Sequence, residues 1–260
     1  MENVLFNEKE KISFKKFDIS KIIIYFTFYS FVGFCFESIF GIFSKGVLEC
    51  RQSFLFGPFC AIYGIGAILM IYILKPLKNN NLPLFFGSCL VGAISEYAMS
   101  YICEIYFHFK WWDYSTSFLN INGRTCLFFA VIWGFLGVLL INFVNPKVDL
   151  IINKLKSKTN KKVFNFAIFG LTIFLFIDIA LSGIALKYFY AKISTDHNLP
   201  NSNYISEKLS YFSNFEFLSE ENILKTYPNL RIAGTHMNNT FVDSLYDNTE
   251  TYYIKFFNKK

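Results

Sequence analysis

The sequence predicts an all-α membrane protein, a polytopic helical bundle of about five transmembrane helices. Of its 260 residues, 53% are hydrophobic and only 17% are charged, whereas about a quarter of the residues of a soluble domain are charged. The mean hydropathy is +0.36. Several apolar runs reach the roughly 20 residues that a helix needs to cross a bilayer, so we expect an integral membrane protein.

Five apolar runs predict the spans. The first is too long for the core of a signal peptide, lacks a small-residue cleavage site and follows a polar arm, so we expect it to remain as a helix. The predicted spans are residues 22–44, 58–75, 83–107, 126–144 and 164–190.

Polar segments flank the predicted transmembrane bundle, which covers residues 22–190. Residues 1–21 should form a cytoplasmic N-terminal arm, and residues 191–260 a polar C-terminal tail that is small or partly disordered. Within the tail, Ser219 precedes the stretch "EENILKTYP". This pattern is typical of a capped short helix that ends before Pro228.

The distribution of lysine and arginine predicts the orientation. The N-terminal arm and the second and fourth loops together hold thirteen Lys or Arg residues, whereas the first and third loops hold four. Because cytoplasmic loops carry the excess of positive charge, the N-terminus should lie in the cytoplasm and the C-terminus outside. The net charge of +6 then reflects lysines beside anionic lipid, and we expect no nucleic-acid partner.

The six cysteines do not form a metal-binding pattern. No CxxC pair occurs and no histidine stands near them in the sequence, so we expect no metal and no cofactor. Cys50, Cys60 and Cys126 should lie at the same membrane face, where both a disulfide and free thiols remain open.

Two glutamates lie inside predicted spans. In "GFCFESIFG", Gly33, Glu37 and Gly41 share one helix face, and Gly92 precedes Glu96 at the same spacing in the third span. Small residues beside a carboxylate allow a second helix to approach closely. A charge near the bilayer centre costs on the order of 3 kcal/mol, so each glutamate needs a proton, a cationic partner or water.

Arg51 and Arg124 are the predicted partners. Loops one and three lie on the same side of the bundle, which brings both arginines near Glu37 and Glu96. The candidate functional cluster comprises Glu37, Arg51, Tyr63, Glu96, Glu104, Trp111, Trp112, Asp113, Arg124 and Asp178. A purely structural cluster and a binding or translocation site both fit this pattern.

Other members of the cluster leave alternatives open. Trp111 and Trp112, in "KWWDYS", would form an aromatic lid or an interfacial anchor. Asp178 has no cationic residue nearby in the sequence, so it would pair across helices, stay protonated or line water. Ser182, one turn further on, extends the same face.

A short internal similarity suggests two repeated hairpins. "SFLFGPFC" at 53–60 and "SFLNINGRTC" at 117–126 each follow a helix with an embedded glutamate, and Tyr63-Gly64 and Trp133-Gly134 follow them in turn. The hairpins would be related by an axis along the membrane normal. Convergent turn chemistry is the alternative.

These motifs, taken in order, resemble the bacterial family called putative ABC-transporter type IV over residues 25–150. The resemblance implies a permease-like protein of the bacterial plasma membrane, with no defined substrate. Phe34 and Ala61 depart from the family pattern, which has Trp and Pro at these places. The matching residues are Glu37, Gly57, Pro58, Tyr63, Gly64, Glu96, Trp112, Asp113, Tyr114, Gly123, Arg124 and Trp133.

The absence of other motifs narrows the function. No GxxxxGK[ST] occurs, so transport energy would come from a separate ATPase subunit or an ion gradient. HExxH and GxSxG are also absent, and we expect no enzyme. The expected partners are the lipid bilayer and either an ATPase or further copies of the chain. The alternatives are a scaffold or sensor whose exported tail binds a partner, and a lipid-modifying enzyme.

Overall fold

The structure, a computed structural model, describes residues 18–199, 215–235, 237–245 and 254–255. Its regular structure is almost entirely helical, which confirms the predicted all-α class. The helices are α1 (Ile19–Lys45), α2 (Ala61–Ile73), α3 (Asn81–Phe107), α4 (Leu127–Leu139), α5 (Asn145–Lys158), α6 (Lys161–Asp196) and α8 (Glu220–Thr226). Two short antiparallel pairs join β1 (Val47–Leu48) to β4 (Ile254–Lys255) and β2 (Phe109–Lys110) to β3 (Arg231–Ile232).

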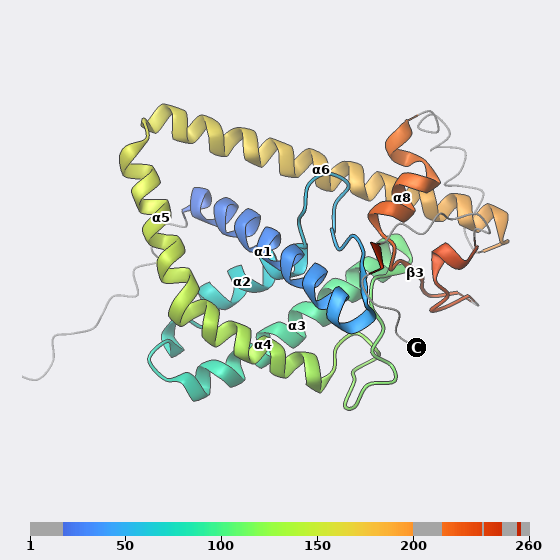
Figure 1. The fold of residues 1–260 in the computed structure, drawn as a ribbon, viewed down its shortest axis with the longest axis horizontal. Helices are drawn as coiled ribbons and strands as arrows, with labels where there is room; N and C mark the ends of the chain where they lie inside the picture. Colours follow the sequence, from blue (N-terminus) through green and yellow to red (C-terminus); the bar gives the residue numbers. More distant parts are fainter. Residues whose placement is uncertain (1–17, 200–214, 236, 246–253, 256–260) are drawn as a thin grey trace, which may run out of the picture.

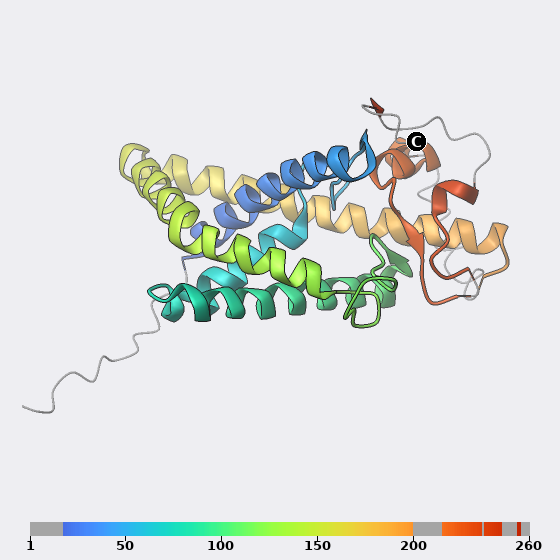
Figure 2. The same ribbon diagram turned by 60° about the horizontal axis from the view of Figure 1, so that its bottom comes forward.

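The helices run up and down along the long axis of the molecule. Figure 1 shows α1, α3 and α6 passing from one end to the other, while α2 and α4 return. The end of α1, the α3–α4 connection and α8 lie at one end, which we call the hairpin-turn end, and the α1–α2 connection runs from this end back to the middle of α6. In Figure 2, α3 and α4 lie on one side of the bundle, and α1 and α6 on the other. Both hairpins therefore turn at the same end, as their parity predicts.

Within the part of the chain that the structure describes, four helical stretches are long and apolar enough to cross a membrane. They are α1, α3, the continuous stretch Leu127–Lys158 and α6. Helix α1 begins where Asp18 Oδ1 accepts a hydrogen bond from Lys21 N and ends at Gly46, whose φ of 77° is left-handed. Helix α6 has 36 residues, so it extends beyond the predicted span at both ends.

The predicted second span, 58–75, contains a shorter helix. Helix α2 has 13 residues, which is about 20 Å of helix against a hydrocarbon thickness of about 30 Å. The chain before it is not helical, because Gly57 has a φ of +84° and Pro58 has no amide hydrogen to donate. Cys60 N donates to Ser30 O in the middle of α1, over 2.9 Å. Helix α2 thus begins deep inside the bundle.

Helix α5 continues α4 through a π-helical turn, Leu140–Val144, and Figure 1 shows the chain changing direction there. Two ion pairs fix α5 on the start of α1: Lys21 with Asp149 over 2.6 Å, and Lys156 with Asp18 over 2.5 Å. Burial alone would raise the pKa of Asp18, but hydrogen bonds from Lys156 and the Lys21 amide lower it overall.

Glycine allows each hairpin to close tightly. A Cβ added at Gly33 would lie 2.4 Å from the Tyr63 side chain, and one added at Gly92 would lie 2.2 Å from Trp133. The two hairpins thus share one packing pattern, a glycine one turn before a glutamate against an aromatic ring. This pattern supports the repeat, and the symmetry axis stays a prediction.

The described part of the C-terminal tail packs on the ends of α3 and α6. Ser219 caps α8 by accepting from Asn222 N, and the helix ends just before Pro228, as the sequence predicts. Residues 200–214, 236, 246–253 and 256–260 lie outside the described residues. The shared apolar core includes Phe109, Phe189, Tyr190, Ile193, Ile223, Tyr227, Ile232 and Val242.

Candidate functional site

Two carboxylates inside the bundle, Glu37 and Glu96, form what we call the inner pair. Glu37 on α1 accepts a hydrogen bond of 2.7 Å from the Tyr63 hydroxyl on α2. Glu96 on α3 accepts one of 2.8 Å from the Thr125 hydroxyl, two residues before α4. Glu96 is only 6% exposed. Each glutamate is therefore held by the returning limb of its own hairpin.

Aromatic residues connect the two halves of the inner pair. The rings of Tyr63 and Trp133 lie 5.2 Å apart. Trp133 packs against Gly92, one helical turn before Glu96, as Tyr63 packs against Gly33 before Glu37. The two carboxylates share one polar region between the hairpins.

The position of the inner pair follows from where α2 and α4 begin. Tyr63 is the third residue of α2, and Thr125 precedes the N-cap of α4, Cys126. The N-terminus of a helix carries a partial positive charge. Each glutamate therefore lies beside the N-terminal end of a helix that begins within the bundle, which offsets part of the cost of its charge.

The two arginines bind other carboxylates than predicted. Arg51 pairs with Glu49, which also accepts from Lys45 over 2.8 Å, and Arg124 pairs with Glu104 over 2.6 Å. The predicted pairs of Arg51 with Glu37 and of Arg124 with Glu96 are not formed. Glu49 and Glu104 lie nearer the hairpin-turn end, so each arginine reaches them without crossing into the bundle.

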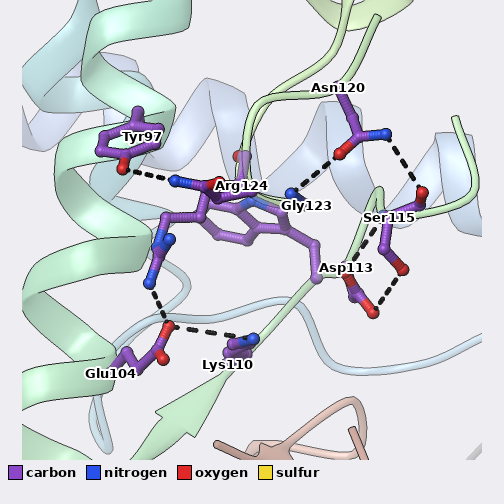
Figure 3. Close-up of polar contacts among 10 residues, drawn as sticks. Tyr97, Glu104, Lys110, Asp113, Ser115, Asn120, Gly123 and Arg124 are labelled. Carbon is purple, nitrogen blue, oxygen red and sulfur yellow. Dashed lines mark hydrogen bonds and ion pairs between the residues drawn. The ribbon is translucent and has the colours of Figure 1, made fainter. Parts of the chain in front are cut away.

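Glu104, Lys110 and Arg124 form a second group, which we call the outer cluster. Figure 3 shows the Glu104 carboxylate between the Arg124 guanidinium and the Lys110 ammonium, whose nitrogen lies 3.8 Å away. The guanidinium also lies over the rings of Tyr97 and Tyr101, with centroids at 5.3 and 5.4 Å. The outer cluster thus anchors the connection between α3 and α4.

The "KWWDYS" residues shape that connection. Trp112 Nε1 donates to Arg124 O over 2.8 Å, and the Trp111 ring packs edge-on against Tyr227 of the tail. Asp113 accepts from the amide and the hydroxyl of Ser115 (Figure 3), so it closes a turn. These contacts give the three residues a structural role in the loop.

The Asp178 side chain accepts a hydrogen bond from the backbone of the segment before α2. Its Oδ1 accepts from Phe56 N over 2.9 Å, and Ser182 Oγ accepts from Leu55 N over 2.8 Å. Phe56 and Leu55 belong to the non-helical segment that leads into α2. Backbone amides inside a bilayer need partners, so this face of α6 supplies them. The sequence alternatives for Asp178 did not include this partner.

Three partners were absent from the predicted cluster: Glu49, Lys110 and Thr125. Glu49 stands two residues before Arg51 in "LECRQ", and Thr125 directly follows Arg124 in "NGRTC", so proximity in the sequence was the available signal. The six cysteines are all free thiols. Among the described residues, no group of His, Cys, Asp or Glu side chains is arranged to hold a metal ion.

Comparison with known proteins agrees with the resemblance. The model of a family described as putative ABC-transporter type IV matches residues 24–183. The match contains both hairpins and extends past the resemblance seen in the sequence into α6, where it includes Asp178 and Ser182. No curated protein and no solved structure matches the chain.

Proposed function

Because this chain belongs to the putative ABC-transporter type IV family, we propose that it is a permease-like component of the bacterial plasma membrane, with Glu37 and Glu96 as the binding site for a cation, a proton or an amine. The N-terminus lies in the cytoplasm and the C-terminus outside in this proposal, as the lysine distribution predicts. The protein moves or senses a cation and catalyses no reaction.

The proposal rests on the lack of a cationic partner for the inner pair among the described residues. Among the described residues, neither Glu37 nor Glu96 makes an ion pair, although seven other ion pairs occur there. A buried carboxylate without a cation costs several kcal/mol. A bound proton or a cationic guest between the hairpins removes that cost.

The arginine pairs strengthen this argument. Arg51 and Arg124 are engaged by Glu49 and Glu104, so neither guanidinium pairs with Glu37 or Glu96. The hydroxyls of Tyr63 and Thr125 donate hydrogen bonds but carry no charge. The site therefore keeps its attraction for a cation.

The energy source is a second part of the proposal. The chain has no GxxxxGK[ST] motif, so coupling to ATP needs a separate ATPase subunit, and the alternative is an ion gradient. Purification in a mild detergent, followed by mass spectrometry of the partners, separates an ATPase complex from a homo-oligomer.

Carbodiimide labelling tests the site directly. Dicyclohexylcarbodiimide reacts with protonated carboxyl groups in apolar surroundings, and mass spectrometry locates the adduct. We expect labelling at Glu37 or Glu96, reduced by added Na⁺, K⁺ or methylammonium. Glu37→Gln with Glu96→Gln abolishes the label, while Glu221→Gln on the exposed side of α8 does not change it. Labelling of Glu37 or Glu96 that no added cation reduces would contradict the cation site.

A scaffold or sensor is the second candidate. It rests on the packing of the tail against α3 and α6, where Lys45 Nζ also donates to Asn229 Oδ1 over 2.5 Å. In a sensor, a ligand that binds the tail changes the conformation of the bundle through these contacts. Methylammonium uptake into liposomes that carry the full chain separates the two candidates. Uptake that is lost when Glu37→Gln and Glu96→Gln are combined favours the permease.

A further inference from the structure

Three basic residues gather at the hairpin-turn end of the bundle: Lys110 on β2, Arg231 on β3, and Arg124 before α4. We infer that they form a binding site for a phosphate group, supplied by an anionic lipid headgroup or by a free phosphate ion. This site is separate from the inner pair, and it does not depend on the proposed transport function.

The first argument is the balance of charge. Glu104 is the acid of the outer cluster, and it lies 2.6 Å from Arg124 and 3.8 Å from Lys110. Arg231 makes no ion pair with any side chain that the structure describes, and its guanidinium lies 3.8 Å from the centroid of the Phe241 ring. Glu104 thus pairs with two cations, and the third cation, Arg231, has no acidic partner among the described residues, so the group lacks negative charge.

The strand pairing places two of these cations side by side. Lys110 and Arg231 are direct partners across the antiparallel β2–β3 pair. Side chains of cross-strand partners leave the sheet on the same face, and like charges at such positions repel each other. An anion bound between the two strands converts this repulsion into attraction.

Hydrogen-bond donors without an acceptor also support a phosphate site. The Lys110 side chain is 10% exposed, and the nearest acceptor it is paired with, Glu104 Oε2, lies beyond hydrogen-bonding distance. Arg124 is 13% exposed, and its Nε is buried without a hydrogen-bond partner among the described residues. Buried cationic groups normally use their donors. Phosphate oxygens accept such bonds from the planar guanidinium and from the ammonium group.

The surroundings favour a headgroup at the membrane surface. Tyr101 and Tyr106, near the end of α3, are 47% and 61% exposed. Tyrosine is typical of the interface, where its ring meets acyl chains and its hydroxyl meets headgroups. Tyr97, held by Asn122 over 3.0 Å, covers one side of the Arg124 guanidinium (Figure 3). A lipid phosphate at this level lies within reach of the basic residues.

Native mass spectrometry of the full chain in detergent tests the site. The probes are phosphatidylglycerol, phosphatidylcholine and inorganic phosphate. The variants Lys110→Gln and Arg231→Gln remove one cation each without touching the Arg124–Glu104 pair. Lys225→Gln, on the exposed face of α8, removes the same charge elsewhere at the same end and serves as the matched control.

We expect phosphatidylglycerol to bind more tightly than phosphatidylcholine, and each site variant to weaken this binding about tenfold, with no change in Lys225→Gln. Binding of inorganic phosphate with the same dependence on Lys110 and Arg231 supports the site and identifies a free ion as a ligand. Equal lipid and phosphate binding by the wild type and both site variants would overturn the inference. A loss as large in Lys225→Gln would overturn it too, because it would reflect net charge alone.

Discussion

The Tyr63 hydroxyl donates a 2.7 Å hydrogen bond to Glu37 Oε1 and so joins α1 to the third residue of α2. The same tyrosine ring lies over Gly33, one helical turn before Glu37, and 5.2 Å from the ring of Trp133 in the second hairpin. One side chain therefore contributes to the closure of the first hairpin, the binding of its carboxylate and the contact between the hairpins.

Removing this hydroxyl should destabilise the bundle. We expect Tyr63→Phe to lower the free energy of unfolding by about 1–2 kcal/mol, because the ring still packs but Glu37 loses its donor. Thermal unfolding in detergent measures the effect. Tyr106→Phe removes a hydroxyl from a ring that is 61% exposed and should be neutral. Equal stability of the two variants would show that the hydrogen bond to Glu37 contributes nothing.

Three glycines provide a graded test of hairpin packing. A methyl group at Gly33 or Gly92 would lie under 2.5 Å from Tyr63 or Trp133, whereas nothing lies within 4 Å at Gly170 of α6. We expect Gly33→Ala and Gly92→Ala each to cost about 1–3 kcal/mol through overpacking. Gly170→Ala should be neutral or stabilise by up to about 1 kcal/mol through helix propensity. The midpoint of thermal unfolding of each variant ranks the three substitutions by how much they destabilise the bundle. If all three variants behave alike, close helix approach is not what these glycines provide.

The packing of the end of α3 against α6 should weaken at acidic pH. Burial, with help from Lys187, lowers the pKa of His108 below its ordinary 6.5, and Glu104 opposes this only in part. The ring lies 4.5 Å from that of Tyr190. Because the folded protein binds the proton less readily than the unfolded chain, stability is complete above pH 6.5 and falls as the pH drops below it.

This pH effect can be assigned to one residue. Unfolding midpoints at pH 7.5 and 5.5 should differ more in the wild type than in His108→Gln, which cannot take up the proton. His197→Gln, at the end of α6, should keep the wild-type difference. A difference that persists unchanged in His108→Gln would have to come from another group.

Two features of the bundle could be predicted from the sequence. Hydropathy predicted the helical class, and the four-residue spacing of Gly33 with Glu37 and of Gly92 with Glu96 predicted close helix neighbours. These features depend on the helical repeat of the sequence, and the same repeat sets the faces of the helices in the structure.

The ion pairs could not be predicted in the same way. The parity of the spans predicts the end of the bundle at which Arg51 and Arg124 lie, but it does not predict how far into the bundle they reach. Depth depends on the path of the loops, and these paths put Glu49 and Glu104 closer than the inner pair. Hydropathy also counts the apolar residues before Cys60 as part of a span, although Pro58 and the left-handed Gly57 prevent a helix there.

The non-helical segment before α2 leads to the last prediction. Asp178 and Ser182 on α6 accept hydrogen bonds from Phe56 N and Leu55 N, and Asp178 is only 1% exposed. Asp178→Ala leaves the Phe56 amide without its hydrogen-bond partner, which should cost about 1–3 kcal/mol. Asp178→Asn keeps an acceptor oxygen at the same place and should cost less.

Hydrogen exchange locates this effect. Mass spectrometry of the peptide that covers residues 53–59 should show faster exchange at Phe56 in Asp178→Ala and at Leu55 in Ser182→Ala, with Asp178→Asn close to the wild type. Ser38→Ala serves as the control, because Ser38 bonds only within α1, to Phe34 O. Faster exchange confined to the 53–59 peptide shows that α6 holds this segment in place. Unchanged exchange in both alanine variants would mean that the segment keeps its position through its own turn, closed by Ser53 N and Phe59 O.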